Sequence, residues 1–535
     1  MLSSVTLCSA TLGEDGQCEP PLGPLYVAAA LEEAGVEVEF RDFQLCQGAH
    51  GFSGEPLARF LACNSGVVAI SCFVDMLPAV VDATRRLREA EPDTVILLGG
   101  PGPTAAAGEI VRSYPWIDGV VRGEGEETIQ EWVRMLREAP GRPVAGMAYR
   151  HLGSIVEGPD RPRARALDNL PPPAYHLVDW AQYTHARLIT TRGCAYRCSF
   201  CDVTALWGNR TVYRGLEATV AEMETLRDRY GMTMVGIADD TFVLNRNRVR
   251  DFCTSLIERR CGIEWGCFGR INLMTPDLVE LMARAGCRAI FYGIDSGSQV
   301  VLDRTVKRVR ARDVIPVLKL SAQYFDTIEA SFIWGYPFES ADDFAATLDL
   351  AAEAAMLAPA VNVQLHMLSP LPLSPIYREF PRELREPEPE DRRWLLLPAL
   401  FLDERASVVR EIVRSRPDIY PGFYAFPTPA MAVKRARMAQ IAAALDRTIG
   451  RTLFESDVAE LLRRENPATE RDLLSSPQDP ADRIGTGLAV SFFRRTRRGS
   501  ASSPASPKQA RGRGPSLVRQ RVEPVTRVAK GRGTP

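Results

Sequence analysis

Three cysteines within eight residues are the part of this sequence best suited to chemistry. Cys194, Cys198 and Cys201 lie in TRGCAYRCSFCDV, residues 191–203, with the spacing C-x3-C-x2-C. Thiolates are soft ligands that suit zinc and the iron of iron–sulfur clusters. A closed zinc site needs a fourth Cys or His, and neither occurs in the forty residues that follow Cys201. The alternative is a 4Fe–4S cluster that the chain holds through three of its irons, with the fourth iron left open.

The cysteine spacing, with Phe200 directly before the last cysteine, resembles the signature of the radical SAM family. In that family the open iron binds S-adenosylmethionine (SAM), and reduction of the bound SAM produces a 5′-deoxyadenosyl radical. The resemblance implies that Cys194, Cys198 and Cys201 hold the cluster and that Phe200 lies beside SAM. It also implies an external electron donor of the flavodoxin or ferredoxin type.

The segments after the cysteines alternate between strand-like and helical patterns, which is typical of a partial (β/α)6-type barrel over residues 185–375. Polar residues follow successive strand-like runs, at the strand ends where such barrels carry their chemistry. By resemblance, the expected SAM contacts are Asp239, Asp240, Arg270, Asp295 and Ser296. Asp295 stands where the family usually has a glutamate. The structural alternatives are a helix cap for the paired aspartates and an ion pair for Arg270.

The first 140 residues alternate continuous apolar runs with amphipathic segments, which predicts a Rossmann-like parallel sheet covered by helices on both faces. Three loops lie at the edge where such sheets bind ligands. They are residues 71–78, GGPGPT from Gly99, and RGEGEET from Arg122. Their glycines let bare backbone approach a bulky ligand, although each loop alone also fits a simple strand-to-helix turn. Together they resemble the cobalamin-binding domain of B12-dependent radical SAM enzymes.

This second resemblance implies a set of cobalamin contacts on the three loops. They are Ser71, Phe73, Val74, Asp75, Met76, Gly99, Gly100, Pro101, Gly102, Gly123, Glu124, Gly125 and Glu126. Many cobalamin domains ligate cobalt with the histidine of a D-x-H-x-x-G motif, which this sequence lacks; His50 stands in QGAHGFSG. We therefore expect base-off cobalamin without a histidine ligand, with Phe73 to Met76 close to the lower face of the corrin.

The remaining segments are assigned by composition. Residues 141–184 form a proline-punctuated linker, and residues 376–493 are predicted to be mostly helical. Tyr420, Phe423, Tyr424 and Phe426 in this region favour packing over substrate contact. Residues 494–535 contain twelve Lys or Arg, one acidic residue, and many Ser, Pro and Gly. That composition predicts a disordered basic tail.

Overall composition places the chain among soluble proteins of several domains, with 535 residues of which 45% are hydrophobic and 25% charged. No signal peptide pattern opens the sequence, no apolar run reaches the ~18–20 residues that span a bilayer, and the other cysteines are scattered. We therefore expect a cytoplasmic protein with reduced thiols and no membrane association. The body has no basic stripe with interleaved aromatic residues, which argues against a nucleic-acid partner.

The two resemblances together imply a cobalamin-dependent radical SAM C-methyltransferase. It would pass a methyl group from SAM, through methylcobalamin, to a carbon of a natural-product intermediate, as in antibiotic biosynthesis. The substrate could be a peptide, an amino acid, or an aromatic or pyrrole-type heterocycle. Two alternatives remain: a B12-dependent cyclase, ring-rearranging or oxidising enzyme without methyl transfer, and a non-catalytic cobalamin and iron–sulfur binding regulator. A methylthiotransferase is disfavoured because residues 1–140 lack a second three-cysteine signature.

Overall fold

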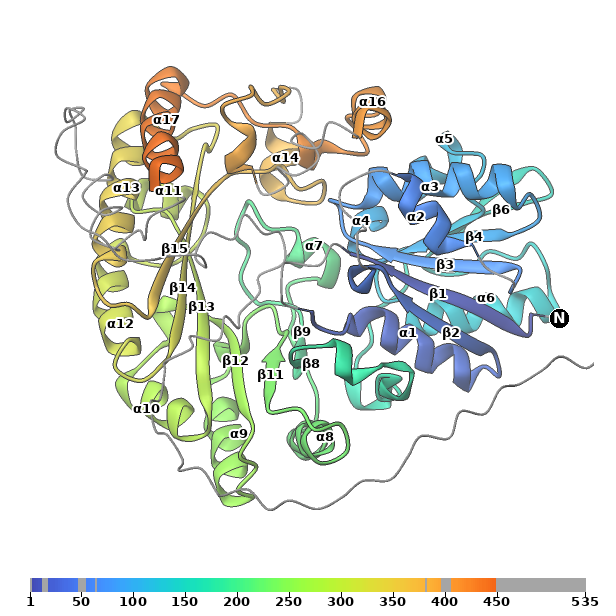
Figure 1. Ribbon diagram of the computed structural model, residues 1–535, viewed down its shortest axis with the longest axis horizontal. Coiled ribbons are helices and arrows are strands. Elements are labelled where there is room, and N and C mark those ends of the chain that lie inside the picture. The colour runs from blue at the N-terminus through green and yellow to red at the C-terminus, as the bar shows by residue number, and fades with distance from the viewer. Residues whose placement is uncertain are drawn as a thin grey trace, which may run out of the picture. The chain divides into compact units, whose positions relative to one another are not determined.

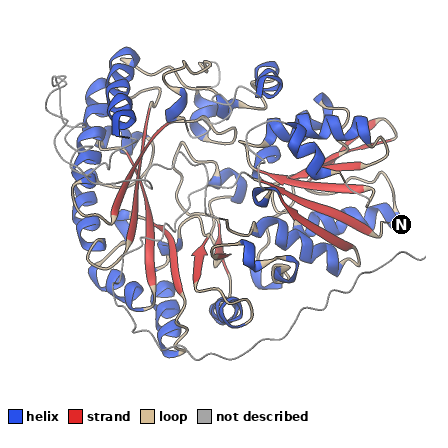
Figure 2. Ribbon diagram, viewed as in Figure 1, coloured by secondary structure: helices blue, strands red, loops and turns tan. Residues whose placement is uncertain are grey.

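The computed structural model describes residues 2–11, 18–46, 54–62, 65–380, 383–395 and 406–448, with side chains up to Ile441 in the last range. These residues contain two large sheets, each flanked by helices, and one small two-stranded sheet (Figures 1 and 2). His50, the part of the predicted helical region beyond residue 448, and the basic tail lie outside the described residues. No described helix is long and apolar enough to cross a bilayer.

The N-terminal sheet has the strand order β2-β1-β3-β4-β5-β6-β7, and its first five strands are parallel. These strands are β1 Ser4–Ala10, β2 Glu37–Asp42, β3 Val67–Cys72, β4 Val95–Gly99 and β5 Gly119–Val121. One face is covered by α1 Leu22–Glu33 and α6 Glu126–Glu138. The other is covered by α2 Gly54–Leu61, α3 Leu77–Ala90, α4 Pro101–Thr104 and α5 Ala107–Ser113 (Figure 1). The predicted Rossmann-like architecture is confirmed.

This sheet extends beyond the expected boundary at residue 140. Strands β6 Met147–His151 and β7 Ser154–Glu157 form an antiparallel hairpin that pairs with β5. Leu152 and Gly153 both have positive φ, 47° and 78°, as a two-residue hairpin turn requires. The buried side chains of Met147 and Tyr149 attach the hairpin to the domain. The N-terminal domain therefore includes the first part of the expected 141–184 linker, whose remainder contains η2 Leu167–Asn169, η3 Tyr175–Leu177 and η4 Trp180–Gln182.

The second sheet has the order β15-β14-β13-β12-β11-β8, and all six strands are parallel. The strands are β8 Ala186–Leu188, β11 Met234–Ile237, β12 Glu264–Gly269, β13 Cys287–Asp295, β14 Thr327–Trp334 and β15 Val361–Met367. The helices of the barrel are α8 Leu216–Asp228, α9 Arg246–Glu258, α10 Pro276–Arg284, α11 Gln299–Arg304, α12 Val314–Ser321 and α13 Ala341–Ala355. This arrangement confirms the expected partial (β/α)6 barrel (Figure 1).

Alternation along the strands separates the two faces of the barrel sheet. Tyr292 on β13 points toward the helices, because its hydroxyl lies 2.8 Å from the Ser321 hydroxyl on α12. Trp334 on β14 likewise packs against Phe344 of α13, with ring centroids 5.5 Å apart. Asp295 ends β13 after a register shift that follows Gly293, and it has φ 72°, so the alternation does not extend to it. Its side chain is placed instead by its ion pair with Lys307.

The C-terminal region adds α14 Pro375–Glu379, α16 Ser407–Ser415 and α17 Met431–Thr448. Helices α16 and α17 lie in the region 376–493, which was predicted to be mostly helical. Tyr420, Phe423 and Phe426 are buried, and the Tyr420 hydroxyl lies 3.0 Å from that of Tyr114 on the N-terminal domain. These aromatic side chains therefore serve packing, as the sequence favoured.

Candidate functional site

The three cysteines lie on the loop between β9 Thr191–Arg192 and α7 Val203–Trp207, where β9 pairs with β10 Val212–Tyr213. Cys198 is buried and Cys194 and Cys201 are half-buried. Among the described residues, no three His, Cys, Asp or Glu side chains gather closely enough to hold one metal ion. The role of Cys194, Cys198 and Cys201 as ligands of a cluster stays a prediction.

Asp239 and Asp240, which follow β11, hold the backbone that leads to the cysteines. Asp239 is buried and accepts hydrogen bonds from the Thr190 and Thr191 amides at 2.6 and 2.9 Å and from the Thr190 hydroxyl at 2.5 Å. Asp240 accepts from the Gly193 amide at 2.8 Å. Burial raises the pKa of Asp239, and it raises the pKa of Asp240 to about 6. The geometry gives both residues a positioning role, and their contact with SAM stays a prediction.

Arg270, after β12, lies beside the cluster loop with donors to spare. Its guanidinium carbon is 3.5 Å from the ring centroid of Tyr196, and Nη1 is 4.0 Å from the sulfur of Cys198. The Arg270 side chain is buried, yet Nε and Nη2 have no hydrogen-bond partner among the described residues. Unpaired buried guanidinium donors are suited to a carboxylate, and this fits the predicted role of Arg270 toward the carboxylate of SAM.

Asp295 and Lys307 form a buried ion pair beside the cysteine loop. Asp295 has φ 72°, and Val306 and Arg308, which flank Lys307, have φ 56° and 55°. Residues other than glycine rarely adopt this left-handed backbone conformation, and such strained residues are concentrated at functional sites. The Lys307 ammonium lies 5.7 Å from the ring centroid of Phe200, so the pair faces the cysteine loop. The sequence offered no pattern that would have identified Lys307.

Burial raises the pKa of the Cys198 thiol, while the nearby charges of Lys307 and Arg270 oppose that rise. Burial likewise raises the pKa of the Cys201 thiol. Thiolates bind iron, so the two cations favour the form of Cys198 that a cluster requires.

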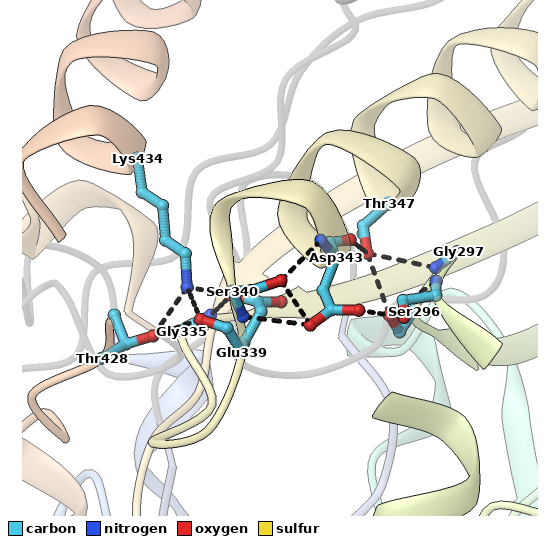
Figure 3. Close-up of polar contacts among 10 residues, drawn as sticks. Ser296, Gly297, Gly335, Glu339, Ser340, Asp343, Thr347, Thr428 and Lys434 are labelled. Carbon is cyan, nitrogen blue, oxygen red and sulfur yellow. Dashed lines mark hydrogen bonds and ion pairs between the residues drawn. The ribbon is translucent and has the colours of Figure 1, made fainter. Parts of the chain in front are cut away.

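Ser296 is used inside the protein rather than exposed to a ligand. It is fully buried, and its hydroxyl lies 2.9 Å from that of Thr347 on α13. The same Thr347 hydroxyl accepts from the Gly297 amide at 3.1 Å (Figure 3). A Cβ at Gly297 would lie 2.1 Å from the Ala346 carbonyl oxygen, so this turn packs tightly on the helix. Contact between Ser296 and SAM stays a prediction.

The first two predicted cobalamin loops pack directly on each other. A Cβ at Gly102 would lie 2.6 Å from the Phe73 carbonyl oxygen, and one at Gly100, which has φ +90°, would lie 2.8 Å from the Cys72 oxygen. Phe73 is 53% exposed, which is unusual for a phenylalanine. Asp75 is buried and its Oδ1 has no hydrogen-bond partner among the described residues. An exposed aromatic ring and an orphaned carboxylate oxygen on one loop fit a large bound ligand.

The other predicted contacts on these loops differ in exposure. Ser71, the last residue but one of β3, and Val74 are half-buried, and Met76 lies in the core. Gly99 closes β4, Pro101 starts α4, and Gly125 precedes α6. A Cβ at Gly123 would meet open space, so backbone is accessible there. The cobalamin contacts of these residues remain predictions.

The third cobalamin loop is tied to the cluster loop by one arginine. Arg192 donates to Glu124 at 2.9 Å and to Glu126 at 2.5 Å, and all three side chains are less than one tenth exposed. Glu124 also accepts from the Ala164 amide at 2.7 Å. Both carboxylates predicted to contact cobalamin are therefore bonded to Arg192. No motif in the sequence identified Arg192, although it stands only two residues before Cys194.

Comparison with known families identifies the domains that carry the third cobalamin loop and the cysteine loop. Residues 9–133 match the B12-binding domain, and residues 188–351 match the radical SAM superfamily. The chain contains a B12-binding domain followed by a radical SAM domain. The predicted order of the two domains is confirmed, an enzyme is favoured over a regulator, and the implied cofactors are cobalamin, SAM and a 4Fe–4S cluster. The donor set described above fits each of the three.

Known relatives of this radical SAM enzyme have more than one activity. An uncharacterised methyltransferase of Pyrococcus horikoshii is 27% identical over 346 residues, which cover 63% of this chain and 74% of the relative. The anaerobic magnesium-protoporphyrin IX monomethyl ester cyclase of Rubrivivax gelatinosus is 27% identical over 352 residues, covering 62% of each chain. The alignment thus spans less than two thirds of the cyclase.

The fold also matches a solved structure, that of the radical SAM methyltransferase TsrM from Kitasatospora setae with cobalamin and a 4Fe–4S cluster bound. The TM-score is 0.62 with 17% identity, over 88% of this chain and 92% of that one. At this identity the match establishes the shared fold.

Proposed function

We propose that this radical SAM enzyme is a cobalamin-dependent C-methyltransferase. The observation that carries the proposal is the Arg192 triad. The buried guanidinium of Arg192, two residues before Cys194, donates hydrogen bonds to both Glu124 and Glu126 of the cobalamin loop. Such a link holds the two cofactor loops against each other. When bound, SAM and cobalamin together supply a methyl group and a radical able to activate an unreactive carbon.

The chain's own residues divide the work of holding these groups. Cys194, Cys198 and Cys201 would hold the cluster, and Asp239 fixes the backbone before them. Arg270 would donate to the carboxylate of SAM through its unpaired nitrogens. On the N-terminal domain, Phe73 and its neighbours up to Met76 would lie under the corrin, without a histidine ligand to cobalt.

The proposed substrate is a natural-product intermediate, either a small molecule or a peptide, and the proposed electron donor is a flavodoxin- or ferredoxin-like protein. The methyltransferase relative and the shared fold support methyl transfer. Neither identifies the carbon that is methylated.

The test is product analysis with the full chain, reconstituted anaerobically with iron, sulfide and cobalamin. The enzyme is supplied with SAM carrying a deuterated methyl group and with a small-molecule extract of its source cells. We expect a product heavier by the labelled methyl group, together with S-adenosylhomocysteine and 5′-deoxyadenosine. S-adenosylhomocysteine with labelled product but no 5′-deoxyadenosine would indicate a non-radical transfer. Formation of S-adenosylhomocysteine or 5′-deoxyadenosine without any labelled product would contradict the proposal.

A second candidate is a B12-dependent cyclisation, ring rearrangement or oxidation without methyl transfer. The cyclase relative, as similar in sequence as the methyltransferase, favours it. The same experiment separates the two, because this reaction would form 5′-deoxyadenosine without labelled product or S-adenosylhomocysteine.

A further inference from the structure

Helix α17 joins the barrel through a fully buried ion pair. Lys434 of α17 and Glu339, in the turn after β14, both have 0% exposed side chains, and Lys434 Nζ lies 2.9 Å from Glu339 Oε2. The ammonium also donates to the Glu339 carbonyl at 2.6 Å and to the Thr428 hydroxyl at 2.6 Å (Figure 3). All three ammonium donors are therefore used. Because burying a charge pair costs desolvation energy, its presence is better explained by what it positions than by stability.

Glu339 in turn closes the turn that follows β14. Its Oε2 accepts a hydrogen bond from the Gly335 amide at 2.8 Å, and Gly335 has φ 86°. The Glu339 amide donates to the Tyr336 carbonyl at 3.1 Å. The carboxylate thus bridges both ends of residues 335–339, and Lys434 holds that carboxylate from behind.

This turn carries a buried hydroxyl to the cysteine loop. Tyr336 is fully buried, and its hydroxyl has no hydrogen-bond partner among the described residues. The Tyr336 ring meets that of Phe200, directly before Cys201, edge-on at a centroid distance of 6.1 Å. Burial, together with the negative charges of Asp295 and Glu339, raises the pKa of Tyr336. Its hydroxyl therefore stays protonated and can donate.

The neighbouring turn, after β13, is held from the same side. Asp343 of α13 accepts from the Ser298 hydroxyl at 2.5 Å, and Thr347 bonds Ser296 as described above. Figure 3 shows the contacts of Asp343 and Thr347 next to those of Lys434 and Glu339. The carboxyl ends of β13 and β14 are thus fixed by helices α13 and α17 outside the barrel.

We propose that Lys434 is a positioning residue for the SAM site: by holding Glu339 it fixes residues 335–339, so that the Tyr336 hydroxyl donates to a polar group of bound SAM. The C-terminal helix α17 is then a required part of the SAM-binding wall. This inference rests on the proposed function only in that the chain binds SAM.

The experiment measures SAM binding to the cluster-loaded full chain by equilibrium dialysis with radiolabelled SAM, along with iron content. Lys434→Met and Tyr336→Phe are each expected to weaken SAM binding about five-fold, with iron near the wild-type level. Lys319→Met, the same change at an exposed lysine of α12, is the matched control and should leave the dissociation constant unchanged. SAM affinity of Lys434→Met within two-fold of wild type would overturn the proposal.

The double variant separates positioning from a general structural role. If Lys434 acts through Tyr336, Lys434→Met/Tyr336→Phe should bind SAM no more weakly than Lys434→Met alone, since coupled residues are not additive. Independent, multiplying losses would overturn the proposal. The low-temperature EPR signal of the reduced cluster gives a second readout: adding SAM should change it in wild type and in Lys319→Met, but only at higher SAM concentration in Lys434→Met.

Lys434→Met leaves Glu339 buried and unpaired, so a second variant guards against misfolding. Glu339→Gln/Lys434→Met removes both charges and keeps an acceptor for the Gly335 amide. Weakened SAM binding by this folded variant supports the proposal, and wild-type binding or failure to fold overturns it. A wild-type chain that binds SAM without methylating any product contradicts the proposed function alone, because the binding comparison still decides the role of Lys434.

Discussion

Asp239 accepts two hydrogen bonds from Thr190, one from its amide at 2.6 Å and one from its hydroxyl at 2.5 Å. Thr190 directly precedes β9, which leads into the cysteine loop, and Asp239 follows the barrel strand β11. The carboxylate therefore transmits the position of the rigid sheet to the loop that would hold the cluster.

Asp239→Asn should impair cluster assembly. An amide has one acceptor oxygen and turns its NH2 toward groups that also donate, so at least one buried donor at Thr190 or Thr191 loses its partner, at a cost of about 1–3 kcal/mol. We expect a lower iron content per chain after reconstitution and a matching loss of absorbance near the iron–sulfur charge-transfer bands. Wild-type iron content would show that the loop is held without Asp239.

Arg192→Met should be among the most destabilising single changes in the chain. It leaves the buried carboxylates of Glu124 and Glu126 without their cation, and breaking a buried ion pair in this way costs about 3–5 kcal/mol. The measurement is the thermal unfolding midpoint. Arg259→Met is the control, because its partners Glu217 and Glu224 are on the surface and such pairs contribute about 0–1 kcal/mol. Equal effects from the two substitutions would contradict the assigned role of Arg192.

Gly102→Ala should disrupt the cobalamin loops. The added Cβ would meet the Phe73 carbonyl oxygen at 2.6 Å, and the contact involves backbone on both sides, so the two loops must separate. We expect at least a ten-fold loss of cobalamin affinity in a titration followed by corrin absorbance. Gly23→Ala is the matched control: nothing lies within 4 Å of its Cβ, and alanine in helix α1 should add about 0.5–1 kcal/mol of stability. Unchanged cobalamin binding by Gly102→Ala would show that the close packing of these loops is not needed.

Asp75→Asn should stabilise the cobalamin-free protein at neutral pH. Burial raises the pKa of Asp75 to about 6 in the folded chain, above the value of about 3.9 in an unfolded chain. The folded state therefore binds a proton between about pH 4 and 6, so this residue's contribution to stability falls as pH rises through that window. At pH 7.5 the asparagine variant should unfold several degrees higher than wild type. At pH 4 the two should unfold at the same temperature.

Substitution of each cluster cysteine tests the assignment of Cys194, Cys198 and Cys201 directly. Alanine at any of the three should reduce bound iron to background and abolish SAM cleavage. A cluster that only three cysteines hold has no spare protein ligand that could replace a missing one. Cys253→Ala, a buried cysteine of α9, should cost packing energy but leave iron content unchanged. Iron loss in Cys253→Ala alone would place the cluster elsewhere.

The two sheets were predictable from the sequence because period and turn chemistry are local properties. Continuous apolar runs mark β1, β3 and β4, and the cysteine spacing locates the cluster loop. The hairpin β6–β7 was missed because its short strands lie in a proline-rich stretch, and only the turn at Leu152 and Gly153 signals it.

The parts of the site that the sequence did not predict depend on contacts between distant segments. Lys307 meets Asp295, Arg192 meets Glu124, and Lys434 meets Glu339 through tertiary packing. Sequence separations of 12, 68 and 95 residues for these pairs follow from their numbering, and no periodic pattern links them. The charges of single residues are visible in a sequence, but their partners are fixed only when the elements pack.

The Arg192 triad also has a thermodynamic consequence. Since one guanidinium joins both loops, ordering of either loop by its ligand lowers the conformational freedom that the other must lose. Cluster assembly and cobalamin binding should then favour each other, and by linkage the factor must be the same in both directions. The chain would behave as a cooperative pair of cofactor sites, filled together more readily than either is filled alone.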